Sequence, residues 1–274
     1  MVYIFYFLNN LNNSNKLLND LENSLDTTKN LFEEQKRYSL SLAILLSEDK
    51  EIIESFLKQD REESFKVINR KIKTLKQLQD SNFEVQIHNK SLTTYLRSWD
   101  IDIKNIPLSS FRQGLVKVKQ SKQPLVSIEL GKRLNIKAIS PIIENNEYIG
   151  SIETIIDFEY LSKELKKKGY ELFVLLDKKH LNIASDLKSN PSLNNYTLVN
   201  SANIHVLEKL NLDDLKDYGY VSTQEHSFVY FVYSDLNNNP LGYILTGIKN
   251  NKQINISNNF DYEVINIDSK VEIR

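Results

Sequence analysis

The stretch from Leu8 to Leu46 contains neither glycine nor proline, and its apolar residues recur every seven positions. One seam of the repeat holds Leu11, Leu18, Leu25, Phe32 and Leu46, and a second seam holds Leu21, Thr28 and Leu42. This 3.5-residue period predicts one long helix. A single helix cannot bury such a seam by itself. We expect part of it to pack on its own domain and part on a second copy, which gives a homodimer through the N-terminal helix.

The period of the pattern changes after this helix. A restart at Ser47 and an apolar stripe from Phe65 to Leu78 predict two further helices. Four segments then have the pattern of strands: 83–87, 125–130, 136–143 and 148–156. A short helix is predicted over 111–119, between the first two strands. Asn145-Asn146 predicts a hairpin turn, and the helix after Asp157 is predicted to end at Gly169 with a left-handed cap. We expect Tyr95, Arg97 and Trp99 to lie in an extended loop.

A smaller pattern of the same kind follows. It predicts strands at 172–176, 181–184, 228–233 and 241–248, a polar loop over 185–201 and a helix near 204–210. The fold class is therefore α+β with antiparallel sheets. The expected division is a helix over 1–50, a first domain over 51–157, a linker helix with a second domain over 158–250, and a tail over 251–274.

Composition excludes several functions. The formal net charge of −1 gives no basic patch for nucleic acid. The chain has no Cys, and His180, His205 and His226 lack metal-ligand spacing. No phosphate-binding glycine loop and no nucleophile motif is present. We therefore expect no catalytic residue, no metal and no cofactor.

The apolar opening stretch, 2–8, is too short to span a bilayer and lacks the features of a signal peptide. It is either the stub of a transmembrane helix or simply the apolar first turn of a helix. The sequence leaves both open.

Three motifs occur in order: SLTTYLRSWD at 91–100, LSSFRQGLVKVKQSKQPLVSIELG at 108–131, and IKAISPIIENNEYIGSIE at 136–153. Together they resemble the membrane-distal half of the double-Cache (paired PAS-like) sensor domains of bacterial chemoreceptors, sensor kinases and cyclases. The chain departs from that pattern at Ser127 and Ala138, where glycine is usual, and at Lys137, where arginine is usual. Lysine keeps the positive charge but loses the planar fork that grips a carboxylate.

The resemblance implies a periplasmic, ligand-binding domain of an inner-membrane receptor, whose transmembrane segments and output domain lie outside this chain. Arg97 and Trp99 are the leading candidates for a pocket, since an arginine fork binds carboxylates and indole forms walls. Arg112 is either a ligand contact or a scaffold partner of Glu129. The full set of candidate ligand-binding residues is Tyr95, Arg97, Trp99, Arg112, Glu129, Lys137, Ser140, Glu153 and His88.

Cations in this set would hold an anionic end of a ligand, and carboxylates would hold an amine or hydroxyl groups. A carboxylate, an amino acid or an amine fits. The main alternative is a helical interaction or scaffold module that binds no small molecule, which the heptad helix by itself would also explain.

Overall fold

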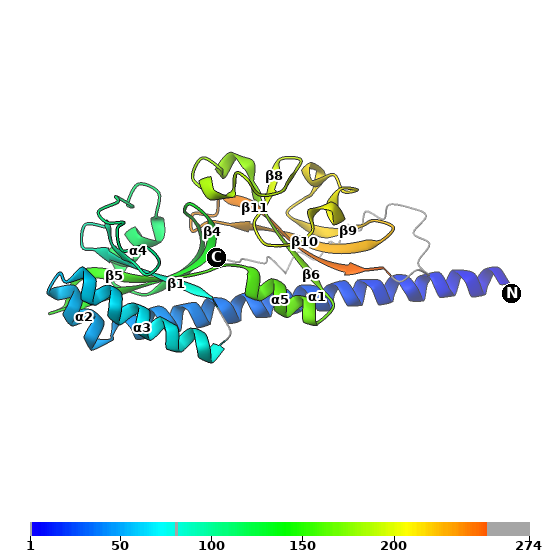
Figure 1. The fold of residues 1–274 in the computed structure, drawn as a ribbon. Coiled ribbons are helices and arrows are strands. Elements are labelled where there is room, and N and C mark those ends of the chain that lie inside the picture. The colour runs from blue at the N-terminus through cyan, green and yellow to red at the C-terminus, as the bar shows by residue number, and fades with distance from the viewer. Residues whose placement is uncertain (1, 80–81, 251–274) are drawn as a thin grey trace. The chain divides into compact units, whose positions relative to one another are not determined.

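The computed structural model describes residues 2–79 and 82–250, and it confirms the predicted α+β class (Figure 1). The chain separates into two compact units. The five-stranded unit comprises residues 33–160 with 235–237, and the six-stranded unit comprises residues 2–32, 161–234 and 238–250 of the described chain. Helix α1 (Val2–Ser47) contributes residues to both units. The predicted tail over 251–274 lies outside the described residues.

In the five-stranded unit, helices α2 (Lys50–Leu57) and α3 (Arg61–Gln79) precede an antiparallel sheet of order β2-β1-β5-β4-β3. Its strands are β1 (Phe83–Asn89), β2 (Thr94–Arg97), β3 (Leu125–Leu130), β4 (Leu134–Glu144) and β5 (Glu147–Ile156). Asn145 and Asn146 both have positive φ in the β4–β5 turn, which confirms the predicted hairpin. Helix α4 (Gln113–Ser121) lies on the face of the sheet opposite α2 and α3 (Figure 1).

Several predicted elements were wrong in kind or position. The segment around Tyr95 and Arg97 is strand β2 rather than a loop, and the following helix begins at Gln113 instead of Phe111. In the six-stranded unit, residues 181–184 form a turn, not the predicted strand, between the 3₁₀ segments Lys178–His180 and Ser185–Leu187. The helix near 204–210 is a 3₁₀ segment, Ile204–Leu207. These stretches are short, and tertiary contacts override weak local patterns in them.

The six-stranded unit has the strand order β7-β8-β6-β11-β10-β9. Helix α5 (Glu159–Lys167) leads into it, followed by β6 (Glu171–Asp177), β7 (Ser192–Leu193), β8 (Tyr196–Leu198), β9 (Tyr218–Ser222), β10 (His226–Ser234) and β11 (Pro240–Lys249). The strands β7, β8 and β9 had not been predicted.

Gly169 follows α5 with a φ of +84°. Tyr170 N–H donates to Leu165 O and Gly169 N–H donates to Lys166 O, so the helix ends in a Schellman motif. The predicted left-handed cap is confirmed.

The seam of helix α1 is buried within the chain itself. Leu21, Leu25 and Phe32 are buried, as are Leu42 and Leu46. Hydroxyl pairs accompany them in each unit: Thr28 meets Thr246 at 2.8 Å, and Ser39 meets Thr154 at 2.8 Å. From Leu21 onward the apolar seam therefore packs on the sheets of its own chain.

Candidate functional site

The face of the five-stranded sheet beneath α4 carries apolar side chains, such as Ile139, together with a group of buried polar side chains. Side chains alternate across a strand, so each residue is assigned to a face by its cross-strand partners. On the face beneath α4, Gln86 lies opposite Glu153, His88 lies opposite Ser151, and Lys137 lies opposite Ser127. The other face packs on α1, α2 and α3.

Arg112 is the centre of the polar face. It stands at the N-cap of α4, and its guanidinium forms salt bridges with Glu129 on β3 (3.1 Å) and with Glu153 on β5. All three residues are buried. The scaffold pairing of Arg112 with Glu129 that the sequence suggested is therefore present, and Ser127 completes it by donating to Glu129 Oε1 at 2.8 Å.

These residues, with His88 and Lys137, form what we call the buried polar cluster. Burial by itself would raise the pKa of Glu153, but the Arg112 guanidinium lowers that pKa well below its usual range. The two carboxylates likewise raise the pKa of Arg112 against the effect of burial. Arg112 and Glu153 are thus both charged at neutral pH.

Gly114 lets α4 approach the cluster. A Cβ atom placed on this residue would lie 2.0 Å from Glu129 Oε1 and 2.9 Å from the Ile139 side chain. Any larger residue would force the carboxylate and the helix apart.

His88 and Glu153 are incompletely satisfied. The His88 Nε2 and Glu153 Oε2 atoms are 3.5 Å apart, and both are buried without a hydrogen-bond partner. The His88 Nδ1 atom is 3.1 Å from Ser151 Oγ, which also accepts from the Tyr148 hydroxyl at 3.2 Å. Burial lowers the pKa of His88, so the imidazole is neutral at pH 7. Buried polar atoms without hydrogen-bond partners are rare and call for an explanation.

Lys137 projects from β4 into the same face. Its ammonium is buried and donates to Leu130 O at 3.2 Å. Burial, reinforced by the nearby positive charge of Arg112, lowers the pKa of Lys137 to about 7.

Arg97 and Trp99 adjoin the cluster at its β2 edge. Arg97 Nε donates to Gln86 Oε1 at 3.1 Å, and its guanidinium stacks on the Trp99 ring at 5.5 Å from the centroid. Trp99 is 41% exposed. The two side chains therefore lie together at the rim of the cluster and not inside it.

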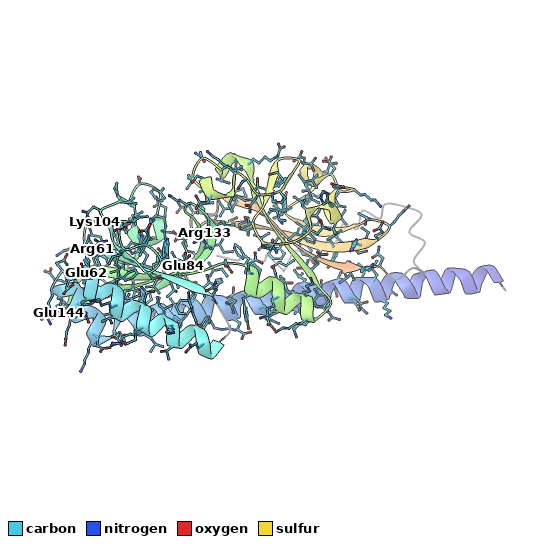
Figure 2. All side chains as sticks on the ribbon, viewed as in Figure 1. Arg61, Glu62, Glu84, Lys104, Arg133 and Glu144 are labelled. Carbon is cyan, nitrogen blue, oxygen red and sulfur yellow. The ribbon has the colours of Figure 1, made fainter. Side chains whose placement is uncertain are left out.

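Arg61, labelled in Figure 2, fixes the segment that carries this pair. From the start of α3 its guanidinium donates to Tyr95 O at 2.9 Å and to the carbonyl oxygens of Ile101 and Ile103. Three carbonyl contacts on both sides of Trp99 hold the backbone in place.

Two predicted site residues lie on the opposite face of the sheet. A β-bulge between β1 and β2 at Ile87/His88 breaks the alternation, so Tyr95 does not point the same way as Arg97. Its ring packs edge-on against Phe56, and its hydroxyl contacts Ser64 at 3.2 Å. Ser140 faces α1, where its hydroxyl accepts from Ser47 at 2.8 Å. Tyr95 and Ser140 therefore lie apart from the buried polar cluster.

The cluster also contains polar residues that the candidate set omitted. Gln86 bridges Arg97 and Thr94, while Ser127 and Ser151 hydrogen-bond to Glu129 and His88. Glu84, Gln86 and His88 alternate with apolar residues along one strand, and this pattern could have placed Gln86 on the same face as His88.

The corresponding face of the six-stranded sheet is apolar. It is filled by a core that includes Phe173, Leu175, Phe228, Tyr230 and Leu245. Among the described residues of this unit, the buried polar side chains are neutral: Ser24, Thr28, Thr197, Asn200, Ser227 and Thr246. Buried Arg and Glu side chains in the described chain all belong to the five-stranded unit.

A groove of about 570 Å³ is also present in the five-stranded unit, away from the buried polar cluster. Phe56, Leu57, Lys90, Lys119 and Ile149 are among its lining residues. The described residues contain no group of His, Cys, Asp and Glu that could hold a metal ion. No described helix is sufficiently long and apolar to traverse a bilayer.

Residues 14–249 match the family model dCache_3, described as the double sensory domain of two-component sensor kinase. No curated protein gave a significant sequence match. Among solved structures, the sensor domain of the V. cholerae histidine kinase DctB aligns with a TM-score of 0.51 at 16% identity, covering 86% of this chain and 98% of that one.

The extracellular domain of a protein described as a histidine kinase aligns with a TM-score of 0.53 at 15% identity, covering 87% of this chain and 93% of that one. A domain of a protein from Vibrio parahaemolyticus, described as belonging to the sensory box/GGDEF family, aligns with a TM-score of 0.52 at 16% identity, covering 88% of this chain and 98% of that one. These likenesses show a shared fold.

Proposed function

Because the chain belongs to the family of double sensory domains of two-component sensor kinases, we propose that it binds a small polar molecule in the buried polar cluster of its five-stranded unit. Binding would be the input of a transmembrane receptor, and the chain itself would carry out no chemical reaction. The five-stranded unit would be the membrane-distal domain, and the six-stranded unit the membrane-proximal one.

The observation that carries this proposal is the burial of ionised side chains on one face of one sheet. Burying charges costs several kcal/mol per ion unless good partners compensate. A sheet that needed only stability would fill this face with apolar residues, as the six-stranded unit does. The unpartnered atoms of His88 and Glu153 support a site that a ligand completes.

The cluster presents both signs of charge to a ligand. Arg112 and Lys137, with Arg97 at the rim, would hold a carboxylate, and Glu153 and Glu129 would hold an amine or hydroxyl groups. An amino acid carries both ends, whereas a simple carboxylate or an amine would use one half of the cluster.

We place the domain outside the cytoplasm, as the periplasmic part of an inner-membrane protein. The extracellular origin of one solved domain of the same fold supports this placement. Homodimerisation through helix α1 is part of the proposal and rests on the heptad seam of the sequence.

The direct test is a thermal-shift screen of carboxylates, amino acids and amines, followed by calorimetry on any compound that raises the melting temperature. Arg97→Ala removes a cation at the rim while its partner Trp99 is already exposed. We expect this variant to lose measurable affinity and to keep its fold, with a melting temperature lowered slightly because the buried Gln86 Oε1 loses a donor. Arg70→Ala, which alters an exposed arginine on α3, is the matched control.

Unchanged affinity of Arg97→Ala would remove Arg97 from the site. Indifference of the wild-type protein to the whole panel would favour the alternative, a scaffold module without a small-molecule ligand. Chemical conversion of a bound compound would instead indicate an enzyme.

A further inference from the structure

Lys137 is a buried cation whose charge is poorly compensated. It is 3% exposed, and its Nζ atom donates to a backbone carbonyl, Leu130 O. The two carboxylates of the buried polar cluster are both engaged by Arg112, and Glu129 also accepts from Ser127. Among the residues that the structure describes, Lys137 takes part in no salt bridge.

The charged groups around Lys137 come from each element that packs on it. Arg112 at the start of α4 and Arg133 in the β3–β4 turn disfavour its positive charge, while Glu153 on β5 and Glu129 on β3 favour it. Gly131 closes the turn over the amine, because a Cβ at that position would lie 2.8 Å from Lys137 Nζ. Burial outweighs the two carboxylates, so the neutral amine is the favoured form above neutral pH.

We propose that Lys137, buried with a backbone carbonyl as its hydrogen-bond partner, takes up a proton when an anionic ligand group binds beside it. This inference rests on the proposed function and deepens it in two ways. The ligand must carry a carboxylate or another anionic group, and its affinity must depend on pH.

The sign follows from proton linkage. A bound anion stabilises the ammonium and therefore raises the pKa of Lys137, so binding above pH 7 consumes a proton. Affinity should then fall by about tenfold between pH 6 and pH 8. An arginine in this position would remain charged throughout this range, so only a lysine permits the coupling.

The first test needs no ligand. The ¹³Cε chemical shift of Lys137, assigned by comparison with Lys137→Met, is followed from pH 5 to pH 11. We expect a midpoint near 7. A midpoint above 10, typical of an exposed lysine, would overturn the inference and leave the proposed function untouched.

The second test uses three matched probes: L-alanine, propionate, which lacks its amine, and ethylamine, which lacks its carboxylate. Calorimetry at pH 6 and pH 8, at each pH in two cationic or zwitterionic buffers of different ionisation enthalpy, reports affinity and the number of protons exchanged. We expect L-alanine and propionate to bind about tenfold more tightly at pH 6, with proton uptake at pH 8. Ethylamine should bind without proton uptake or fail to bind.

Variants assign the effect to one side chain. Lys137→Arg should bind the anions with no dependence on pH in this range, and Lys137→Met should bind them weakly at both pH values. Lys104→Met, which alters an exposed lysine labelled in Figure 2, should behave as the wild type. Amide NMR spectra of each variant check that the fold is retained.

Anion binding that is equal at pH 6 and pH 8, without proton uptake, would overturn the coupling while it supported the proposed function. Tight binding of a ligand without any anionic group would overturn the requirement for an anion. A screen in which nothing binds, together with an NMR midpoint near 7, would count against the proposed function and not against the ionisation of Lys137.

Discussion

Arg112 ties three elements of the five-stranded unit together. It reaches from the N-cap of α4 to β3 and β5, where it forms salt bridges with Glu129 and Glu153 and lowers the pKa of Glu153 against the effect of burial. The same residue that completes a candidate ligand site therefore also holds the helix on the sheet. Removing it leaves Glu129 and Glu153 buried without their cation.

We expect Arg112→Met to lower the free energy of unfolding by about 3–5 kcal/mol, because it leaves uncompensated charges in the interior. The triple variant with Glu129→Gln and Glu153→Gln should recover part of that loss, since the stranded carboxylates become neutral. Urea denaturation of the two variants and the wild type measures the difference. A loss under 1 kcal/mol for Arg112→Met would mean that water or another cation reaches the carboxylates.

At the scale of the secondary-structure elements, the C-terminus of helix α5 is set by local backbone conformation. Helix α5 stops at Gly169 because the next backbone conformation is left-handed, and the Schellman hydrogen bonds of Tyr170 and Gly169 satisfy its last carbonyls. A Cβ atom placed on Gly169 would have no other atom within 4 Å. The preference for glycine here is therefore conformational and not steric.

Gly169→Ala should destabilise the protein by about 1 kcal/mol, which is the usual cost of a left-handed conformation for a residue with a Cβ atom. Gly169→Asn should cost less, because asparagine tolerates this region. Chemical denaturation gives both values. Equal stability of all three proteins would show that the end of α5 is remodelled at no cost.

At the scale of the whole molecule, helix α1 packs on the sheets of both units. Its seam from Leu21 onward is occupied by the chain's own sheets, and Leu18 is only partly buried. A second copy, if it packs on α1, would therefore use the heptads that precede Leu21.

We expect Leu18→Glu to shift the protein from dimer to monomer in sedimentation velocity experiments, because a carboxylate in an apolar seam is costly to bury. Leu45→Glu alters a leucine of the same helix that is 66% exposed, and it should leave the oligomeric state unchanged. A monomeric wild-type protein at high micromolar concentration would remove the dimer from the proposal.

The sequence alone predicted the elements that rest on local physics. Sustained periodicity predicted helix α1 and the long strands, and a single residue type in the right place predicted the Asn145-Asn146 hairpin and the Gly169 cap. Charged residues alternating with apolar ones in β3 and β5 pointed to Glu129 and Glu153. These features depend on neighbours within a few positions, so one chain suffices to read them.

Tertiary structure decided which way the remaining side chains face. One bulge in the β1–β2 ladder turned Tyr95 toward α2 and α3, and the packing of α1 claimed Ser140. Strands far apart in the chain must pair in a fixed register before one face can hold Arg112, Lys137 and His88 together. Register and burial arise from long-range packing, which no local pattern in a single sequence contains.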